Sequence, residues 1–550
     1  MRFWRLLQPD KAEIRNVYIY SVFNGLVALS LPLGIQAIIN LIQGGQVNAT
    51  WIVLVAFVVL GVAANGLLNI YQLRIVENLQ QKIFGRAAFE FAYRMPRIRM
   101  EALARHYAPE LMNRFFDVVS VQKGLAKILI DFTAAAVQVL FGLMLLSVYH
   151  PFFIIFSIVL LLLAFGIFRL TGKRGLRTSL EESKHKYQVA YWLEELARTN
   201  TTFKLAGTAH LPMQRIDRHV DSYLDARQRH FSVLMSQYGL MVGFKVVVAA
   251  GLLVIGSILV MEQFMNLGQF VAAEIIILLV INSVEKLIST LETIYDVLTS
   301  LEKVGQVTDM ELEASDGRDL AADCGDCGLT VTLEDVGITF PDRATPALRN
   351  INLHIRHGET VVVKGASGSG KSALLQVLAG LYKVEGRVLY NDYPVGSLEP
   401  GSLRKVIGDC LSQEQLFQGT VYENIAMGRG AATQENVDWA VRKLHLREFI
   451  TSLPKGIDTE LHPGGMNLPR SVVQKLLLAR SVADKPRLLL LDKALEFVPE
   501  DELPAIIGFL TAADKPWTLV AVSNDELLTH LADQTIELSN GELLPEPVNA

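Results

Sequence analysis

The sequence predicts an α-helical domain with six membrane spans, followed by a soluble α/β domain of the P-loop class. Three observations lead to this prediction. Apolar residues make up 51% of the 550 residues and charged residues only 19%, against roughly 25% charged residues in an ordinary soluble domain. The long charge-free stretches all lie in the first half of the chain. A glycine-rich phosphate-loop motif then follows a short apolar run in the second half.

Runs with no charge, or with one, define the six candidate spans, because a helix needs about 20 largely apolar residues to cross a bilayer. His150 separates two of these runs, so we expect a tight hairpin there. The runs are residues 16–73, which hold two spans broken by the polar residues 43–48, then 132–149, 151–168, 238–261 and 264–284.

Charged residues near the last two spans carry a more specific expectation. If the chain turns near residue 264, Lys245 and Glu285 both lie about 30 Å from the turn, at a rise of about 1.5 Å per residue. They share a depth and can pair. Glu274 lies only about 15 Å from the turn, near the midplane, where an ionised group is costly. Glu274 therefore either faces the bundle interior or a cavity, or is protonated and bonded to a neighbouring helix.

Lysine and arginine alternate along the connections. The three short turns hold none, whereas residues 1–15, 79–124 and 173–235 hold four, eight and eleven. Because basic residues are retained on the cytoplasmic side, both termini are predicted to be cytoplasmic. The two long connections continue helical spacing, so we expect the spans to extend into the cytoplasm as helices.

The domain boundaries follow from composition. We predict a transmembrane domain over residues 1–305, a linker over 306–328 and a soluble domain over 329–550. The linker is acidic, and its Cys324 and Cys327 have metal or redox spacing without a second pair to complete a site. We expect solvated linker cysteines. A net charge of -5 argues against a nucleic-acid partner.

The phosphate-loop motif G-x-x-x-x-G-K-[ST] stands at the end of an apolar run, Thr360 to Lys364, and before a helical segment. Its glycines let backbone N–H groups curl round a phosphate, the lysine faces the outer phosphates, and the serine hydroxyl suits Mg²⁺. A second apolar run ends in Asp492, as a Mg²⁺-binding strand requires. The motif residues are Gly365, Ala366, Ser367, Gly368, Ser369, Gly370, Lys371 and Ser372.

With six spans ahead of these motifs, the chain resembles an ATP-binding cassette (ABC) half-transporter of the type I exporter class over nearly its whole length. The resemblance implies ATP and Mg²⁺ as cofactors, with Phe340 stacking on adenine. It implies that Gln413, in a glutamine loop, joins Ser372 and Asp492 at the metal. Residues 107–115 and 191–196 look like the short helices that dock on the cassette.

The same resemblance implies a location and partners. The chain is expected to be a multi-pass protein of a bacterial inner (plasma) membrane, in contact with the lipid bilayer. It is expected to act as a homodimer or as a heterodimer with a related half-transporter. The transported substrate cannot be predicted from the sequence.

Two catalytic positions depart from the family pattern. The carboxylate that assists the attacking water just after Asp492 is replaced by Lys493, which when protonated cannot accept a proton. Glu496 stands three residues further on and could substitute only from an unfavourable place in the turn. The switch histidine is replaced by Asn524, which can donate a hydrogen bond but carries no charge.

The signature loop departs as well. Where the family has Leu-Ser-Gly-Gly-Gln, this chain has Pro469, Arg470 and Ser471 after a leucine, which removes a hydroxyl, a backbone N–H and two glycines. Arg470 is either a compensating phosphate contact or an exposed charge. The aspartate loop has Pro499 in place of its aspartate. The phosphate cradle is intact while these positions have changed, so we expect ATP binding with weak or absent hydrolysis.

Two functions remain open at this point. The first is an ATP-dependent exporter that works as a dimer. The second is a non-transporting ATP-binding subunit with a regulatory or assembly role. Whether the chain is an ATP-hydrolysing enzyme stays undecided by the sequence.

Overall fold

The computed structural model describes residues 8–44, 49–207, 210–323, 325, 328–341, 343–412 and 414–544. They form two compact units. The first consists of Met1–Pro96 and Ala108–Met310, and the second of Arg97–Tyr107 and Glu311–Ala550. Gln413, Cys324 and Cys327 lie outside the described residues.

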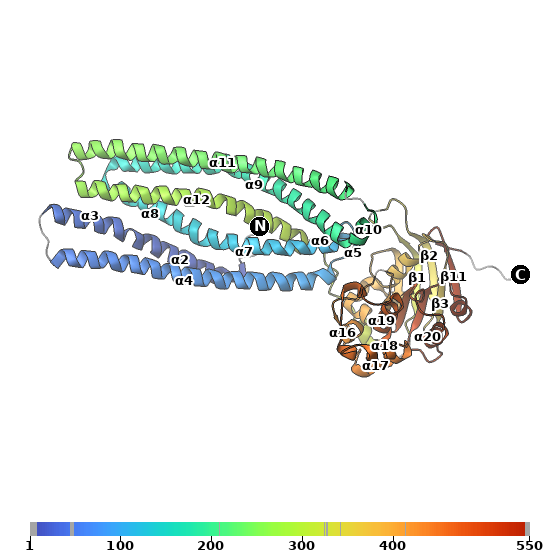
Figure 1. The fold of residues 1–550 in the computed structure, drawn as a ribbon. Coiled ribbons are helices and arrows are strands. Elements are labelled where there is room, and N and C mark those ends of the chain that lie inside the picture. The colour runs from blue at the N-terminus through green and yellow to red at the C-terminus, as the bar shows by residue number, and fades with distance from the viewer. Residues whose placement is uncertain are drawn as a thin grey trace. The chain divides into compact units, whose positions relative to one another are not determined.

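The first unit is a bundle of long helices (Figure 1). In the described part of the chain, six helical segments are long and apolar enough to cross a membrane, which confirms the six predicted spans. Most of them reach 42 to 52 residues, about twice the length that a bilayer needs. The helices are α2 (Lys11–Ala28), α3 (Ser30–Gln43), α4 (Ala49–Arg94), α6 (Ala108–Asn113), α7 (Asp117–Lys127), α8 (Thr133–Tyr149), α9 (Pro151–Arg198), α10 (Asn200–Leu205), α11 (His210–Met261) and α12 (Leu267–Thr308).

Local chemistry sets the breaks between these helices. The first span divides at Leu29 because Pro32 has no backbone N–H to donate to the preceding turn. The predicted hairpin at His150 is confirmed, since its Nδ1 atom accepts from the N–H of Phe152 at the start of α9. The turn near residue 264 is confirmed as well, and a capping box between Asn266 and Gln269 begins α12.

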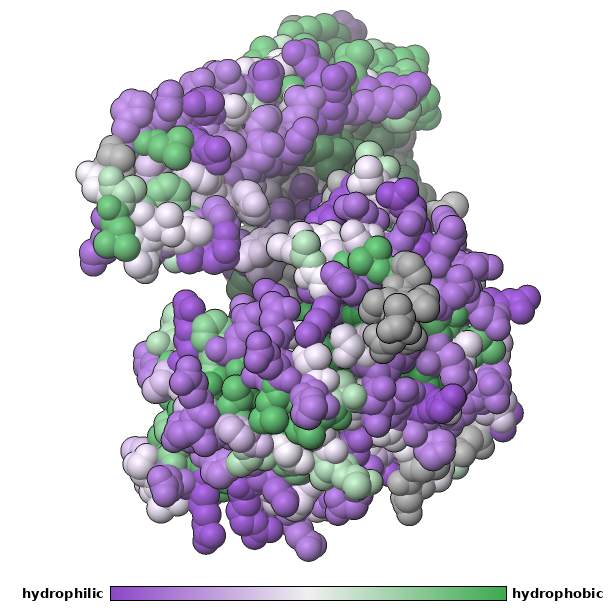
Figure 2. Space-filling view, turned by 90° about the vertical axis from the view of Figure 1, so that its right-hand side faces the viewer, coloured by the Kyte–Doolittle hydropathy of each residue, from purple (hydrophilic) through white to green (hydrophobic). Residues whose placement is uncertain are grey.

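Hydrophilic residues cover the ends of the first-unit helices that face the viewer in Figure 2, and hydrophobic residues lie farther back along them. This distribution is typical of helices that leave a bilayer and continue into water. Buried hydrogen bonds connect three of these helices, α9, α11 and α12. Gln237 donates to the Thr171 hydroxyl at 2.9 Å and to the Tyr295 hydroxyl at 2.8 Å.

One expected docking helix is displaced along the chain. Within the second unit, the segment Arg97–Tyr107 packs with the α/β domain. Ile98 pairs with Leu312, and the carboxylate of Glu101 accepts from the backbone N–H of Lys383 at 2.7 Å. The docking segment therefore precedes the predicted one, 107–115, most of which belongs to the first unit.

The prediction of a second, separate docking helix at residues 191–196 is wrong. Residues 191–196 lie inside α9, which runs without a break to Arg198. No glycine or proline occurs between Gly175 and Thr199 to end the helix earlier.

The second unit is built on two principal sheets. The larger one has the strand order β12-β11-β3-β10-β9-β6 and is parallel except for β12, whereas the smaller one, β2-β1-β4-β5, is antiparallel. The strands are β1 (Val331–Ile338), β2 (Leu348–Ile355), β3 (Thr360–Lys364), β4 (Glu385–Tyr390), β5 (Tyr393–Pro394), β6 (Ile407–Cys410), β7 (Gly419–Thr420), β8 (Glu460–Leu461), β9 (Leu488–Asp492), β10 (Thr518–Val522), β11 (Gln534–Ser539) and β12 (Glu542–Leu543).

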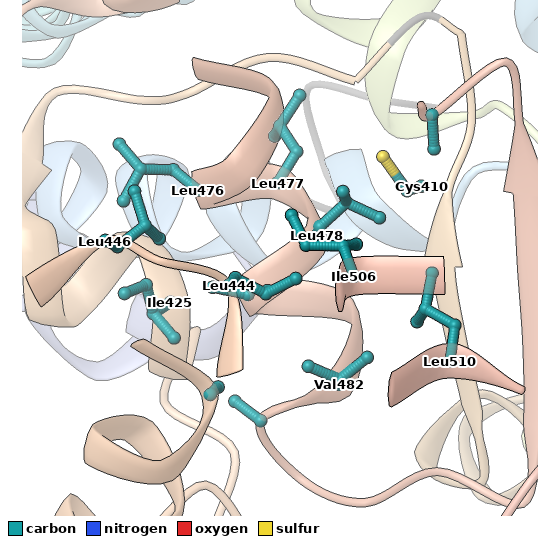
Figure 3. Packing of buried hydrophobic residues seen from close by; sticks show 14 of the residues in the cluster. Cys410, Ile425, Leu444, Leu446, Leu476, Leu477, Leu478, Val482, Ile506 and Leu510 are labelled. Atoms are coloured by element: carbon teal, nitrogen blue, oxygen red, sulfur yellow. The ribbon is translucent and has the colours of Figure 1, made fainter. Parts of the chain in front are cut away.

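Helices cover these sheets and form a second core. Leu476 and Leu478 of one helix pack with Leu444, Ile506 and Leu510, as Figure 3 shows. The helices of this unit are α5 (Met100–Leu103), α13 (Leu320–Asp323), α14 (Lys371–Leu378), α15 (Pro400–Lys405), α16 (Val421–Ala426), α17 (Gln434–Lys443), α18 (Arg447–Ser452), α19 (Arg470–Val482), α20 (Leu503–Leu510) and α21 (Glu526–His530).

The segment predicted as a linker packs on the α/β domain where it is described. Glu313 forms a bidentate ion pair with Arg404, with N–O distances of 2.6 and 2.7 Å. Leu320 is buried in the core of the small sheet, and its N–H donates to the Ser402 hydroxyl. The chain from Glu311 onward therefore belongs to the second unit.

Candidate nucleotide-binding site

The phosphate loop lies between β3 and α14, at the carboxyl edge of the parallel sheet. Gly365, Gly368 and Gly370 have φ values of 136°, 84° and 107°, which side-chain-bearing residues rarely adopt. At Gly365 a Cβ atom would lie 2.2 Å from the carbonyl oxygen of Leu538. The loop conformation therefore requires these glycines, as the motif predicts.

Lys371 reaches back over this loop. Its Nζ atom donates to the carbonyl oxygens of Gly365 and Ala366, both at 2.7 Å, and lies 3.5 Å from the hydroxyl of Ser369. The ammonium group thus sits on the concave side of the loop. A phosphate bound there would meet this positive charge together with the N–H groups at the start of α14.

The chain's residues fit a Mg²⁺ ion beside the loop. Asp492 ends β9 and is only 4% exposed, and its Oδ1 atom has no hydrogen-bond partner among the described residues. A buried carboxylate oxygen without a partner is costly unless a cation or another donor satisfies it. The exposed hydroxyl of Ser372 lines the same cavity. Oxygen ligands of these two kinds are the ones that Mg²⁺ prefers.

A cavity of about 1160 Å³ brings most of the predicted residues together. Phe340 stands at one side, held edge to face by Tyr382 with ring centroids 5.0 Å apart. The predicted residues that line the cavity are Phe340, Gly365, Ser367, Gly368, Gly370, Lys371, Ser372, Asp492, Lys493 and Asn524. Ser412 also lines it, next to the undescribed Gln413.

Several lining residues were not predicted from the sequence, and three of them are polar or charged side chains of interest. Arg343 and Arg349 add positive charge to the cavity, and Asn540 lies in the turn between β11 and β12. The N–H of Gly541 in this turn donates to the carbonyl of Ser369. A β-turn signal at Asn540-Gly541 is visible in the sequence, but its position against the phosphate loop depends on strand order.

Lys493 follows the buried strand with a φ of 57°, and its N–H donates to the carbonyl of Val522. Its Nζ atom lies 3.4 Å from Oε1 of Glu496, and both side chains are about half exposed. The nearby carboxylate of Glu496 is therefore in contact with Lys493, the residue at the position of the catalytic carboxylate.

Asn524 belongs to a loop whose conformation is stabilised by hydrogen bonds of Asp525. The Asp525 carboxylate accepts from the N–H of Leu528 at 2.9 Å and caps α21, while its own N–H donates to the Ser523 hydroxyl. This capping places Asn524 at the cavity wall. The position of the predicted switch residue is thus fixed by its neighbours.

The predicted signature residues do not line the cavity of their own chain. Pro469 precedes α19 and makes no side-chain cap, and Ser471 lies in the first turn of the helix. The guanidinium of Arg470 lies 5.5 Å from the centroid of the Phe497 ring. This contact is a cation–π geometry, so Arg470 has a partner in its own chain.

A buried polar cluster links the glutamine loop to α19 and was not predicted from the sequence. Arg480 donates to the carbonyl oxygens of Gln415 and Asn424, at 3.2 and 2.8 Å. Burial and the neighbouring Asp409 carboxyl raise the pKa of Glu414, whose Oε1 accepts from the N–H of Leu411. The cluster connects the loop that carries Gln413 to the helix that follows the signature segment.

The fold and the cavity together define a multi-span membrane protein with a P-loop nucleotide-binding domain. Two family models match the chain: ABC transporter transmembrane region over residues 15–284, and ABC transporter over residues 348–496. The chain belongs to the ABC transporter family and has the half-transporter architecture of one transmembrane and one ATP-binding domain.

Individual relatives agree with this assignment. The chain is 27% identical over 477 residues, 84% of its length, to the cyclolysin secretion/processing ATP-binding protein CyaB of Bordetella pertussis, and spans 66% of that protein. It is 31% identical over 224 residues, 40% of its length, to the ABC-type transporter kk1G of Curvularia clavata, and spans 17% of it. The chain thus spans less than two thirds of the length of these relatives.

A solved structure shares the whole fold. The chain resembles a bacterial Atm1-family ABC exporter with ATP bound, with a TM-score of 0.87 and 19% sequence identity, over 97% of this chain and 95% of the other. At this identity the likeness supports the type I exporter fold and not a substrate.

Proposed function

We propose that this chain is one half of a dimeric ABC exporter that binds Mg-ATP tightly and hydrolyses it slowly. The observation that carries the proposal is the cavity in the second unit. It combines an intact phosphate loop and an unpartnered buried Asp492 oxygen with a lysine at the position of the catalytic carboxylate. It supports binding chemistry and offers little for hydrolysis.

Binding follows from the residues that face the nucleotide. Lys371 and the loop N–H groups would hold the phosphates, and Phe340 offers an aromatic face to the base. Ser372 and Asp492, with Gln413, would hold Mg²⁺, which neutralises phosphate charge when bound. Arg343 and Arg349 add cations to the same cavity.

Slow hydrolysis follows from what the cavity lacks at the reacting end. Lys493 cannot take a proton from water while it is charged. Glu496 stands three residues beyond the position of the catalytic carboxylate, and its Oε1 atom lies 3.4 Å from the Nζ atom of Lys493. Asn524 offers a neutral donor where the family has histidine. Losses of roughly 10² to 10³ per missing group are typical of electrostatic transition-state stabilisation.

The dimer follows from the architecture of the family. Each ATP site in such a dimer uses the phosphate loop of one chain and the signature loop of the other. The segment of Pro469, Arg470 and Ser471 would therefore act on the partner's nucleotide, in a homodimer or in a heterodimer with a related half-transporter. In either assembly no site has every part of the usual machinery.

Export is proposed from the relatives and the fold, across a bacterial inner membrane with both termini in the cytoplasm. The relative CyaB is described as a secretion/processing protein and the structural neighbour as an exporter. The alternative is a non-transporting, ATP-loaded subunit that regulates or holds together a membrane complex. The substituted hydrolysis positions are what favour this second candidate.

The test measures ATP turnover and nucleotide occupancy of the purified chain in lipid, with and without candidate partner subunits. We expect high occupancy and a turnover well below about 1 per second, low in the usual enzyme range. Lys493→Glu alone should recover little, because the signature and switch substitutions remain. Turnover above that rate without a partner would contradict slow hydrolysis. Occupancy without any turnover would favour the non-transporting subunit.

A further inference from the structure

One face of α9 is exposed along its whole membrane-spanning part and then becomes basic. Ile155, Ile158, Leu162 and Phe165 are 64%, 53%, 63% and 66% exposed in the chain. They share one side of the helix, since residues three and four apart neighbour each other on its surface. The same side continues into three exposed cations at intervals of four residues, which we name the α9 basic stripe: Arg169, Lys173 and Arg177.

Two of the three cations of the stripe, Arg169 and Lys173, are not neutralised by their surroundings. α9 and α11 lie side by side, and the bonds from Gln237 to Thr171 (2.9 Å) and between His230 and Thr178 (2.8 Å) fix their levels. At the level of Arg169 and Lys173 neither helix supplies a carboxylate, because residues 151–180 and 226–261 contain no aspartate or glutamate. Within the described chain, Glu181 is the ion-pair partner of Arg177, at 3.3 Å, and no partner is found for Arg169 or Lys173.

At another membrane exit of this unit, the protein neutralises only part of the basic charge. Where α2 and α4 leave the apolar part of the bundle, Lys82 lies 2.7 Å from the carboxylate of Glu13, and Arg86 pairs with Asp10. Lys82 and Arg86 are thus paired within the protein, whereas Arg15 and Arg74, which flank the charge-free run there, are exposed and have no ion-pair partner in the described chain. The α9 basic stripe differs in that its unpaired cations, Arg169 and Lys173, continue one exposed apolar face of a single helix.

We propose that this face of α9 binds an anionic phospholipid of the surrounding bilayer. The α9 basic stripe would hold the phosphate, and the acyl chains would lie along Phe165, Leu162 and Ile158. The order of the residues carries the argument: apolar side chains come first, and cations begin at Arg169, where the charge-free run ends. Arg169 to Arg177 cover about 12 Å along the helix, a span that headgroups at the bilayer surface can occupy.

Charge complementarity selects the occupant. Unpaired basic residues just outside a membrane span attract the negative cytoplasmic surface of the bilayer and concentrate anionic lipids. A second copy of the chain would have to bring both an apolar face and carboxylates at the same two depths. A lipid molecule carries both parts already, with its phosphate next to its acyl chains.

The test uses the full chain reconstituted in phosphatidylcholine with a small fraction of spin-labelled lipid. Electron paramagnetic resonance then compares the motionally restricted fraction of spin-labelled phosphatidylglycerol with that of spin-labelled phosphatidylcholine. One variant carries Arg169→Gln, Lys173→Gln and Arg177→Gln. The matched control carries Lys184→Gln, Lys204→Gln and Arg218→Gln, which remove the same charge from exposed positions farther along the helices.

We expect the unaltered chain and the control to prefer phosphatidylglycerol. In the stripe variant the preference for phosphatidylglycerol over phosphatidylcholine should be at least about fivefold smaller, given the usual attraction of a basic residue near an anionic surface. The preference of the unaltered chain should also fall as salt screens the charges. Equal preference in all three proteins would overturn the proposal, and so would an equal loss in the stripe variant and the control. If the stripe variant fails to fold, a preference of the unaltered chain that is insensitive to salt overturns it.

Discussion

The Nζ atom of Lys245 on α11 lies 2.5 Å from the Oε2 atom of Glu285 on α12. Both positions are about a third exposed in the chain. The pair confirms an expectation drawn from depth alone, because the two residues lie at similar distances from the turn that joins their helices. Their charges offset each other beside the apolar part of the bundle.

The first prediction concerns this pair. Lys245→Met leaves Glu285 without its cation, and Glu285→Gln leaves Lys245 without its anion. Each single change should reduce the free energy of unfolding by about 1 to 2 kcal/mol, as expected for a partly exposed pair. The melting temperature of the protein in lipid should fall accordingly. The double variant should recover part of the loss, because no unpaired charge remains.

Thermal unfolding in nanodiscs measures this effect. Lys286→Met is the matched control, since it removes an exposed charge next to Glu285. Additive losses in the double variant would show that the two side chains do not depend on each other.

Local patterns in the sequence predicted those parts of the molecule that depend on neighbouring residues. The phosphate loop is one, since strand, glycines and helix follow one another along the chain. The hairpin at His150 is another, because a single polar residue between two apolar runs leaves little choice of turn. The pairing of Lys245 with Glu285 needed only the helical rise and the position of one turn.

Parts that depend on strand order or on long-range packing were not predicted. Arg343, Arg349 and Asn540 reach the cavity only because β2 and β11 lie where the sheet topology puts them. The docking segment Arg97–Tyr107 was missed because its packing on the α/β domain leaves no periodic signal in so short a segment. Helix propensity alone would have predicted that α9 continues beyond Leu196. The prediction instead placed a separate docking helix at residues 191–196, and this was wrong.

The second prediction tests the phosphate loop. Lys371→Ala removes the cation on the concave side of the loop and should abolish nucleotide binding. Fluorescent ATP analogue binding to the full chain measures the change. Lys405→Ala, an exposed lysine in the same unit, should bind as the unaltered protein does. Unchanged affinity in Lys371→Ala would mean that the nucleotide binds elsewhere.

The third prediction concerns pH. Burial and the Asp409 carboxyl raise the pKa of Glu414 from an ordinary value of 4.5 to about 9. Between these values the folded chain holds a proton that the unfolded chain has released, so stability falls as pH rises through this window. Glu414→Gln keeps the neutral hydrogen-bonding group and removes the titration. Its melting temperature should therefore fall less between pH 6 and pH 9 than that of the unaltered protein.

Melting curves of the full chain at several pH values measure this dependence. Glu448→Gln, at an exposed position, is the control and should keep the pH profile of the unaltered chain. A Glu414→Gln profile that matches the unaltered one would mean that Glu414 is already ionised in the folded protein.

The last prediction concerns Lys493. Lys493 can have either of two roles: a clamp on the γ-phosphate of ATP, or a tolerated side chain that points to solvent. In the structure Lys493 lines the cavity and pairs with Glu496 at 3.4 Å, with both side chains about half exposed. An exposed pair of this kind holds its partners weakly, so Lys493 is able to leave Glu496 when a phosphate offers a stronger, charge-assisted contact.

If Lys493 is a clamp, Lys493→Gln should weaken ATP binding by roughly 1 to 3 kcal/mol, the usual worth of a hydrogen bond to a charged group. ADP affinity should change little because ADP has no γ-phosphate. Glu496→Gln is the informative companion: it releases Lys493 from its partner, so ATP affinity should stay equal or rise. Titrations of ATP and ADP against the three proteins measure these affinities. Equal effects of Lys493→Gln on both nucleotides, or none on either, would leave Lys493 as a solvent-facing substitution in a cassette that binds ATP without its help.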